Sequence, residues 1–317
     1  MLTYLITGGS GFIGSHLAQT LAAQGERVRI LDDLSTGRIE NLASFRERVE
    51  FVQSDIRRLD AIRPHFEDVD YVLHMAAMPS VPRSVADPVT SNAVNVEGTL
   101  NVLLAARDAG VKRVVFAASS AAYGDNPQMP RVETLLPAPL SPYALTKVTG
   151  EYYCRVFARL YGLETVALRF FNIFGPRQNP YSQYTGVLSK FITCYIRRET
   201  AVIFGDGEQS RDFTYVANVV DAVLKACKAP GASGGVFNVG VGESYTLNYT
   251  LGVLNRIFGY EMKPRHEGPR AGDVRESLAD ITLARRVLGY EPQVRFEDGL
   301  LRTVEWCRAE LGREAAS

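Results

Sequence analysis

The stretch TYLITGGSGFIGSHLAQTL, residues Thr3–Leu21, decides the fold of this 317-residue chain. It starts as a short apolar run typical of a buried strand and continues with the apolar spacing of a helix. Glycines mark the junction of the two, and three of them follow a G-x-x-G-x-x-G spacing. Gly8 permits a tight turn, Gly11 lets the backbone approach a pyrophosphate, and Gly14 lets the helix pack closely on the strand. The helix N-terminus, with its free N–H groups and positive dipole end, would then face the phosphates.

Strands and helices alternate through the first half of the chain. Short β-branched runs predict strands at Thr3–Thr7, Val28–Leu31, Val49–Gln53, Tyr71–Met75, Val114–Ala118 and Thr165–Phe170. Longer amphipathic runs predict helices at Phe12–Gln24, Ala61–Phe66, Val89–Ala109 and Pro142–Tyr161. This alternation indicates an α/β fold, a doubly wound parallel sheet of the Rossmann type with helices on both faces.

The second half is less regular and predicts a smaller α/β domain that caps the sheet. Helices are expected at Val187–Arg198, Ala217–Lys228, Leu247–Phe258, Ile281–Leu288 and Phe296–Leu311, and strands at Ala201–Phe204 and Val236–Val239. We expect the strand at Val236–Val239 to return to the main sheet, so that the domains interleave. Residues 1–172 and 212–243 would form the dinucleotide-binding domain, and residues 173–211 and 244–317 the substrate-binding domain.

The composition is that of an ordinary globular protein, with 46% hydrophobic and 22% charged residues and a formal net charge of zero. Scattered Lys and Arg residues argue against nucleic acid or an anionic membrane as the main partner. No apolar run approaches the ~20 residues of a membrane span, and no signal peptide is evident, so we expect a cytoplasmic protein. The four cysteines and four histidines show no metal-ligand spacing, so we expect reduced thiols and no metal site.

Asp32 ends the second predicted strand, about 20 residues beyond the glycines. A carboxylate there accepts hydrogen bonds from the adenosine ribose hydroxyls and would repel a 2′-phosphate. The sequence therefore favours NAD as the cofactor, with Asp33 expected at the same site. Arg38 lies near enough to leave NADP as an open alternative.

Tyr143 and Lys147 form a Y-x-x-x-K pair within a predicted helix. Residues four apart share one helix face, so the ammonium can lie near the phenol and lower its pKa. Tyr143 then becomes a general base, and Lys147 can also hold the nicotinamide ribose. The alternative is an exposed Tyr and Lys on an amphipathic helix, which the preceding dinucleotide loop disfavours.

The G-x-x-G-x-x-G spacing resembles the extended branch of the short-chain dehydrogenase/reductase superfamily. This resemblance implies further cofactor contacts. Phe12 and Ile13 belong to the glycine loop, Asp55 and Ile56 resemble the adenine contact, Ala76 and Ala77 resemble the turn that borders the cofactor, and Asn95 resembles the structural Asn. The segment SSAAYG, residues 119–124, resembles the family's S-S-x-x-Y-G. It implies that Ser119 is the catalytic hydroxyl, with Ser120 as second choice.

Over nearly its whole length the chain resembles the UDP-hexose 4-epimerases. Related dehydratases and decarboxylases carry a carboxylate just after the catalytic hydroxyl, whereas this chain has Ser120 and Ala121 there. The resemblance thus implies reversible oxidation at C4 of a UDP-sugar with tightly bound NAD, and no elimination. It also implies that Asn172, Arg211, Arg270 and Asp273 contact the substrate diphosphate, since guanidinium groups suit phosphate oxygens.

Three positions bear on the sugar. Ser277 occupies the place where a Tyr restricts these epimerases to the plain hexoses, so UDP-GlcNAc and UDP-GalNAc are expected substrates beside UDP-Glc and UDP-Gal. Asn179 replaces the Arg of UDP-glucuronate 4-epimerases, which disfavours the uronic acid. Arg83 lies in a segment that resembles the sugar-contacting loop of N-acetylhexosamine epimerases.

Two alternatives stay open: a UDP-glucuronate 4-epimerase, and a catalytically silent NAD-binding regulator. The presence of Ser119, Tyr143 and Lys147 argues against the second. The resemblance also implies a homodimer, in which the helices near Val89–Ala109 and Pro142–Tyr161 pair into a four-helix bundle. The apolar faces of these helices could equally be buried on the sheet.

Overall fold

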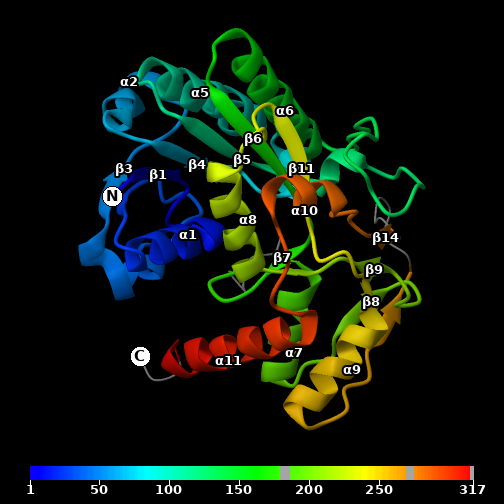
Figure 1. Ribbon diagram of the computed structural model, residues 1–317. Coiled ribbons are helices and arrows are strands. Elements are labelled where there is room, and N and C mark those ends of the chain that lie inside the picture. The colour runs from blue at the N-terminus through cyan, green and yellow to red at the C-terminus, as the bar shows by residue number, and fades with distance from the viewer. Residues whose placement is uncertain (179–185, 269–274, 315–317) are drawn as a thin grey trace.

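The computed structural model describes residues 1–178, 186–268 and 275–314, and the side chains up to residue 310. Its centre is a seven-stranded sheet in the order β11-β6-β5-β4-β1-β2-β3, with every neighbouring pair parallel (Figure 1). The strands are β1 (Thr3–Thr7), β2 (Arg27–Asp32), β3 (Glu50–Gln53), β4 (Tyr71–His74), β5 (Arg113–Ser119), β6 (Glu164–Phe170) and β11 (Gly235–Val239). The predicted fold class is confirmed, including the return of the strand at Val236–Val239 to the main sheet.

Helices cover both faces of this sheet, because successive side chains of each buried strand point to opposite faces. On β1, Tyr4 and Ile6 belong to the core under α1 (Phe12–Ala23), α8 (Val216–Lys228) and the 3-10 segment η1 (Ile39–Arg48). Leu5 belongs to the core on the other face, under α5 (Gly98–Asp108) and α6 (Pro142–Leu160). The short α2 (Leu59–Ile62) and η2 (Arg63–Phe66) complete that second layer.

The helix expected at Val89–Ala109 is divided in the structure. It consists of α4 (Pro88–Asn92), a π-helical turn η3 (Ala93–Glu97) and α5. Asn95 lies in the π-helical turn with its side chain buried against Met78, and the wide turn places an amide inside the core. The helix α3 (Val81–Ala86) and the segment η1 were not predicted, because both are short and lack a clear apolar period.

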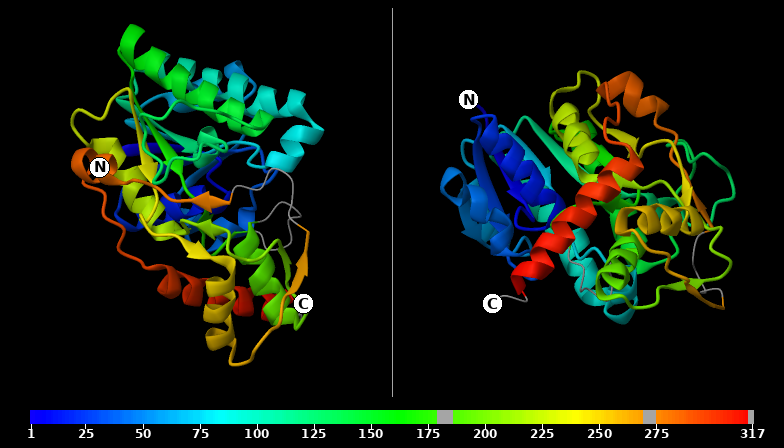
Figure 2. Two further views of the ribbon diagram at one scale, coloured as in Figure 1. Left: turned by 90° about the vertical axis from the view of Figure 1, so that its right-hand side faces the viewer. Right: turned by 90° about the horizontal axis from the view of Figure 1, so that it is seen from below.

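A smaller lobe lies below the sheet and carries the C-terminal helix (Figures 1 and 2). Its helices are α7 (Val187–Arg197), α9 (Leu247–Phe258) and α11 (Phe296–Glu314), and its strands include β8 (Val202–Phe204) paired with β13 (Arg265–Glu267). They share a core in which Phe296 stacks on Phe213 and on Tyr245 at centroid distances of 5.2 and 4.5 Å. Short pairs link the lobes: β7 (Ile173–Phe174) with β10 (Thr214–Tyr215), and β9 (Ser210–Arg211) with β12 (Tyr245–Thr246) and β14 (Glu276–Ser277).

The expected division into domains needs one correction. Residues 244–317 were assigned to the cap, but the segment from Ala279 to Tyr290, with α10 (Thr282–Leu288), packs in the core of the main sheet. Tyr290 is fully buried there and donates a hydrogen bond of 2.8 Å to the carbonyl of Gly240. This segment is too short to reveal from its own pattern which core it joins. Among the described residues, no helix is long and apolar enough to cross a membrane.

Candidate active site

The residues predicted to carry the chemistry meet at the carboxyl edge of the sheet. Gly8 follows β1, Ala76 follows β4, and Ser119 ends β5. The strand order reverses between β1 and β4, and ligands of doubly wound sheets bind at such a reversal. The fold therefore directs the glycine loop and the Y-x-x-x-K helix toward one place.

Tyr143 is held in the first turn of α6. Ser141 caps this helix by accepting a hydrogen bond of 3.2 Å from the N–H of Ala144, and Pro142 suits the first helical position. The backbone N–H of Tyr143 donates to Ser84 Oγ at 3.0 Å, which ties the turn to α3. Burial raises the pKa of the Tyr143 phenol, and its hydrogen bond with Ser119 opposes that rise. The structure thus brings the predicted hydroxyl and the predicted base together.

Lys147 is buried one turn further along α6. Its Nζ donates to the carbonyl of Ala117 at 2.8 Å and lies 5.0 Å from the ring centroid of Phe116. Burial lowers the pKa of this ammonium to about 8. The Nζ is 6.0 Å from the Tyr143 ring centroid, and Lys147 is not among the groups that shift the phenol pKa. The expectation that Lys147 lowers that pKa is wrong for the protein alone, because burial of the phenol dominates.

The glycine loop packs so closely that a side chain does not fit at two of its positions. Gly8 has φ +68°, and a Cβ on it would lie 2.7 Å from the backbone nitrogen of Ala76. A Cβ on Gly14 would lie 2.2 Å from the carbonyl oxygen of Gly8, so only glycine lets α1 start this close to β1. Gly11 caps α1 without a side-chain hydrogen bond. The first N–H groups of α1 could therefore bind phosphate oxygens.

Asp32 is positioned as a buried carboxylate at the end of β2. It is 6% exposed and accepts hydrogen bonds of 2.9 Å from the backbone N–H groups of Ser10 and Leu34. Burial raises its pKa, and these two N–H groups oppose the rise. A Cβ on Gly37 would lie 2.9 Å from both carboxylate oxygens, so a glycine keeps the space beside them open. This arrangement fits a ribose diol and disfavours a phosphate.

Asp33 and Arg38 do not join Asp32. The Asp33 carboxylate is exposed and accepts hydrogen bonds from the N–H and the hydroxyl of Ser35. Arg38 lies 3.7 Å from Glu40, a pair of exposed side chains. Because Arg38 is paired with Glu40, it gives little support for binding a 2′-phosphate, and so for NADP as the cofactor.

The predicted adenine contacts have other partners in the structure. The Asp55 carboxylate accepts hydrogen bonds from the Arg57 guanidinium, at 2.6 to 3.1 Å, and from the Arg57 backbone N–H at 2.9 Å, and this guanidinium lowers its pKa. The side chain of Ile56 is 5% exposed and packs in the core, and its carbonyl accepts from Asn101 Nδ2 at 3.0 Å. Ala76 and Ala77 are half-buried in the turn beside Gly8.

Three of the predicted diphosphate and sugar residues converge in the lobe interface. Asn172, at φ +34°, donates from Nδ2 to Ser277 Oγ at 3.3 Å and to the carbonyl of Asp212 at 3.1 Å. Ser277 pairs with Arg211 in the register of β14 and β9. The Arg211 guanidinium donates to the carbonyls of Ser210 and Arg275 at 2.9 and 3.3 Å.

Asp212 organises this region, although the sequence analysis gave it no role. It is fully buried, and its carboxylate accepts hydrogen bonds from the N–H groups of Val241, Gly242 and Ala279, at 2.8 to 3.2 Å. Burial raises its pKa to about 6. Its position directly after Arg211 was the one available signal.

The other positions that the sequence analysis singled out for the substrate lie on α3, at the end of β5 or outside the described residues. Arg83 is half-buried on α3, next to the Ser84 that holds Tyr143. Ser120 begins the 3-10 turn η4 (Ser120–Tyr123), beyond the Ser119 that bonds the phenol. Arg270, Asp273 and Asn179 lie outside the described residues.

A buried ion pair behind the site was not predicted either. Arg169 of β6 donates to both carboxylate oxygens of Glu151 on α6, at 2.8 and 2.7 Å. Its guanidinium lies 4.6 Å from the ring centroid of Tyr123, whose hydroxyl donates to Asn238 Oδ1 at 2.7 Å. The pair joins the helix that carries Tyr143 to the sheet.

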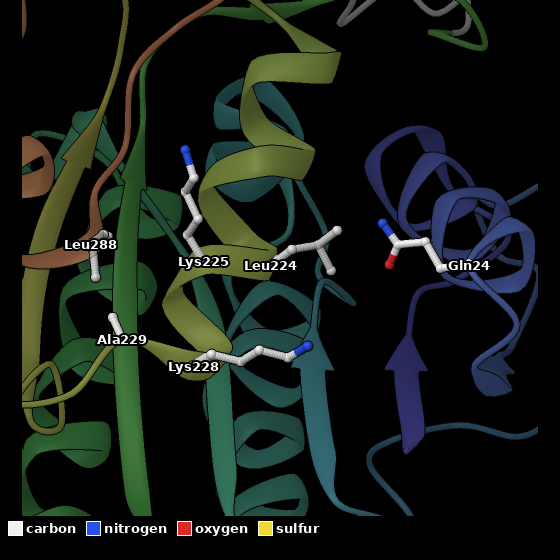
Figure 3. A pocket seen from close by; sticks show the side chains of 6 residues that line it. All are labelled: Gln24, Leu224, Lys225, Lys228, Ala229 and Leu288. Carbon is white, nitrogen blue, oxygen red and sulfur yellow. The ribbon is translucent and has the colours of Figure 1, made fainter. Parts of the chain in front are cut away.

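Figure 3 shows a surface depression on the opposite edge of the sheet. It lies between the C-terminal ends of α1 and α8, and its lining includes Gln24, Lys228 and Lys225, whose ammonium is 2.9 Å from Asp221. Nothing in it resembles the chemistry at the carboxyl edge. Within the described residues, no cluster of three or more His, Cys, Asp or Glu side chains is arranged to hold a metal.

Comparison with known proteins gives consistent matches along the chain. A family model described as the NAD dependent epimerase/dehydratase family matches residues 4–240. The UDP-glucose 4-epimerase of Mycolicibacterium smegmatis is 41% identical over 309 residues, which cover 96% of this chain and 98% of that protein. The structure of the UDP-N-acetylglucosamine 4-epimerase from Methanobrevibacter ruminantium M1 with UDP-N-acetylmuramic acid has a TM-score of 0.93 and 38% identity, covering 98% of this chain and 99% of that one. The UDP-glucose 4-epimerase of Thermotoga maritima with UDP-glucose also has a TM-score of 0.93, with 40% identity and coverage of 98% and 100%.

Proposed function

This chain belongs to the NAD dependent epimerase/dehydratase family, and from that premise we propose that it interconverts UDP-GlcNAc with UDP-GalNAc and UDP-Glc with UDP-Gal. At the coarser level it is an NAD-dependent UDP-sugar 4-epimerase. The observation that carries the proposed substrate range is Ser277, whose small side chain lies against Asn172 and opposite Arg211.

The glycine loop and Asp32 would hold the cofactor. The N-terminus of α1 would bind the pyrophosphate, Asp32 the adenosine ribose, and Lys147 the nicotinamide ribose. When bound, NAD supplies reversible hydride transfer at C4. The backbone N–H of Gly8 donates to the carbonyl of Leu31 at 2.8 Å and ties the loop to the sheet, which supports tight retention of the cofactor.

Tyr143 would act as the general base on the C4 hydroxyl. After the 4-keto sugar has rotated within the site, Tyr143 would return the proton. Ser119 bonds the phenol and would share this proton with the substrate oxygen. With its pKa near 8, Lys147 is largely an ammonium at neutral pH, where it would hold the nicotinamide ribose, and the positive charge of bound NAD would favour the phenolate. No carboxylate follows Ser119, so elimination lacks an acid and a base.

Asn172 and Arg211 would hold the diphosphate, together with Arg270 and Asp273, and Arg83 would contact the sugar. Arg211 and Ser277 lie side by side on the paired strands β9 and β14. The residues for phosphate binding and for sugar selection would therefore share one strand pair. The small Ser277 leaves space beside C2 for an N-acetyl group.

The direct test is incubation with UDP-GlcNAc and with UDP-Glc, in separate reactions without added NAD, with the products resolved by NMR. Formation of both C4 epimers supports the reaction, the substrate range and the retained cofactor together. Rapid turnover of UDP-GlcA with none of UDP-GlcNAc would instead establish the UDP-glucuronate 4-epimerase. Absence of turnover with NAD bound would favour the silent regulator, which the bond between Ser119 and Tyr143 argues against.

We also propose a homodimer formed by α6 and the helices α3 to α5 beside it. These helices lie together on one outer side of the sheet (Figure 2). The outer face of α6 exposes Leu145, Tyr152, Val156 and Leu160, and that of α3 and α4 exposes Val81, Val85 and Val89. Exposed apolar side chains in such number favour association. Sedimentation velocity should give twice the 34.9 kDa chain mass, and a Leu145→Glu, Val156→Glu double variant should give monomers.

A further inference from the structure

His74 is a fully buried histidine that the proposed mechanism does not use. It ends β4 beside the glycine loop and is 1% exposed. Both ring nitrogens have hydroxyl partners: Thr7 Oγ1 lies 2.7 Å from Nδ1, and Thr99 Oγ1 lies 2.9 Å from Nε2. Two buried threonines on separate elements therefore fix this ring.

The partners of the two threonines decide which ring nitrogen carries the proton. Thr99 Oγ1 donates its hydrogen to the carbonyl of Asn95 at 2.7 Å, so it can only accept from His74 Nε2. Nε2 is therefore protonated, and Nδ1 accepts from Thr7. The Thr7 oxygen in turn accepts from the N–H of Ala76 at 3.3 Å. Every donor and acceptor in this series of hydrogen bonds around His74 has a single role.

The chain of hydrogen bonds continues to the base. Asn95 Oδ1 accepts from the N–H of Met78 at 2.8 Å, and its Nδ2 donates to Thr146 Oγ1 at 3.0 Å. Thr146 then donates to the carbonyl of Tyr143 at 2.8 Å. One end of this buried network is thus the backbone beside the cofactor loop, and the other is the backbone of Tyr143.

We propose that His74 is a positioning residue that joins the cofactor loop to the catalytic helix as a neutral, Nε2-protonated imidazole. The Thr7 end sets the turn at Ala76, whose backbone nitrogen would be 2.7 Å from a Cβ on Gly8. The Thr99 end sets the π-helical turn from which Asn95 reaches Thr146. His74 thereby fixes the position of the nicotinamide end of the cofactor site relative to the Tyr143 phenol. This inference rests on the proposed function.

Only the neutral ring satisfies this network. A second proton on Nδ1 would face Thr7 and force its hydroxyl to find another acceptor. Lys147 is the positive charge that acts on His74, across the Phe116 ring that lies 5.6 Å from the imidazole and 5.0 Å from the ammonium. Burial and this charge lower the pKa of His74 to about 3.

The tautomer can be tested without any enzyme assay. Long-range 1H–15N spectra of the purified protein, with His74 assigned by comparison with His74→Gln, should show Nε2 protonated and Nδ1 unprotonated. The pattern should not change between pH 8 and pH 5. A protonated Nδ1, or titration of His74 in that range, would overturn the inference even if the enzyme is active.

The positioning role is tested at Thr99, where valine keeps the shape and removes the hydroxyl. With whichever UDP-sugar turns over, Thr99→Val should lower kcat by roughly tenfold and leave KM for the sugar nucleotide within about twofold, since the Asn172–Ser277 region is untouched. Thr99→Ser should restore kcat. The matched control is Thr250→Val, another fully buried threonine that donates to a carbonyl four residues back, in α9.

Two results separate this inference from the proposed function. If Thr99→Val and Thr250→Val lower kcat equally, or if Thr99→Ser does not restore it, Thr99 is merely structural and the inference fails. If no UDP-sugar turns over at all, the proposed function fails, and the spectra of His74 alone then decide whether the ring is locked as described.

Discussion

Breaking the buried pair of Glu151 and Arg169 should cost several kcal/mol of stability, and Glu151→Gln tests this. The substitution keeps the shape of the side chain but removes its charge. The two side chains are only 5% and 4% exposed, so the Arg169 guanidinium would be left uncompensated in the interior. Removing one partner of a buried ion pair costs about 3–5 kcal/mol. At ~2–4 °C per kcal/mol for a large domain, Tm should fall by at least ~6 °C.

The effect on turnover follows from the position of Glu151. It lies one turn beyond Lys147 and two beyond Tyr143 on α6, and Arg169 anchors it to β6. Loosening this anchor should lower kcat at temperatures well below Tm, because the phenol and ammonium share the helix. Thermal unfolding followed by circular dichroism gives Tm, and initial rates at 25 °C give kcat.

The exposed pair of Arg285 and Glu291 is the control. It has a similar distance of 2.8 Å, but its side chains are 50% and 54% exposed, so Glu291→Gln should cost only about 0–1 kcal/mol. A double variant, Glu151→Leu with Arg169→Met, removes both buried charges and should recover part of the lost stability. Equal decreases in Tm for Glu151→Gln and Glu291→Gln would refute the prediction that breaking the buried pair costs more stability than breaking the exposed one.

Four further predictions concern the site itself. Tyr143→Phe should lower turnover by at least about a hundredfold while NAD stays bound; unchanged turnover would exclude it as the base. Ser277→Tyr should abolish activity on UDP-GlcNAc and keep it on UDP-Glc, and competition between the two substrates measures this. In Gly14→Ala the new Cβ would lie 2.2 Å from the carbonyl of Gly8, so the purified protein should lose its bound NAD, as judged by absorbance after denaturation. Because burial lowers the pKa of Lys147 to about 8, activity should fall as pH rises through that value; a profile flat to pH 10 would contradict the role of its ammonium.

The local sequence pattern was sufficient to predict most strands of the main sheet and several helices. β1 and α9 have the predicted bounds, and β4, β6 and α6 differ by a residue at one end. The strands among them are continuous buried runs and the helices have an apolar period near 3.6 residues, and both signals depend only on neighbours in sequence. The prediction missed the division of the helix at 89–109, where one continuous apolar pattern conceals a π-helical turn.

The sequence also indicated which residues are candidates for the chemistry, because several of them serve local geometry. Gly8, Gly11 and Gly14 are required by a tight turn between a strand and a helix, and Tyr143 and Lys147 share a helix face. Spacing along the chain specifies both arrangements. It could not specify the pKa of Tyr143, since burial by distant segments outweighs the charge one turn away.

By itself, then, the sequence determined the doubly wound sheet, the dinucleotide loop and the Tyr143–Lys147 pair, since each depends on periodicity or on spacing within one element. Only the tertiary structure decided the partners of buried polar groups. Arg169 meets Glu151 from 18 residues away, His74 meets Thr7 from 67 residues away, and Asp212 bonds the N–H of Ala279, again 67 residues distant. A buried polar atom must find a partner wherever the fold brings one, and no local pattern encodes which distant atom that will be.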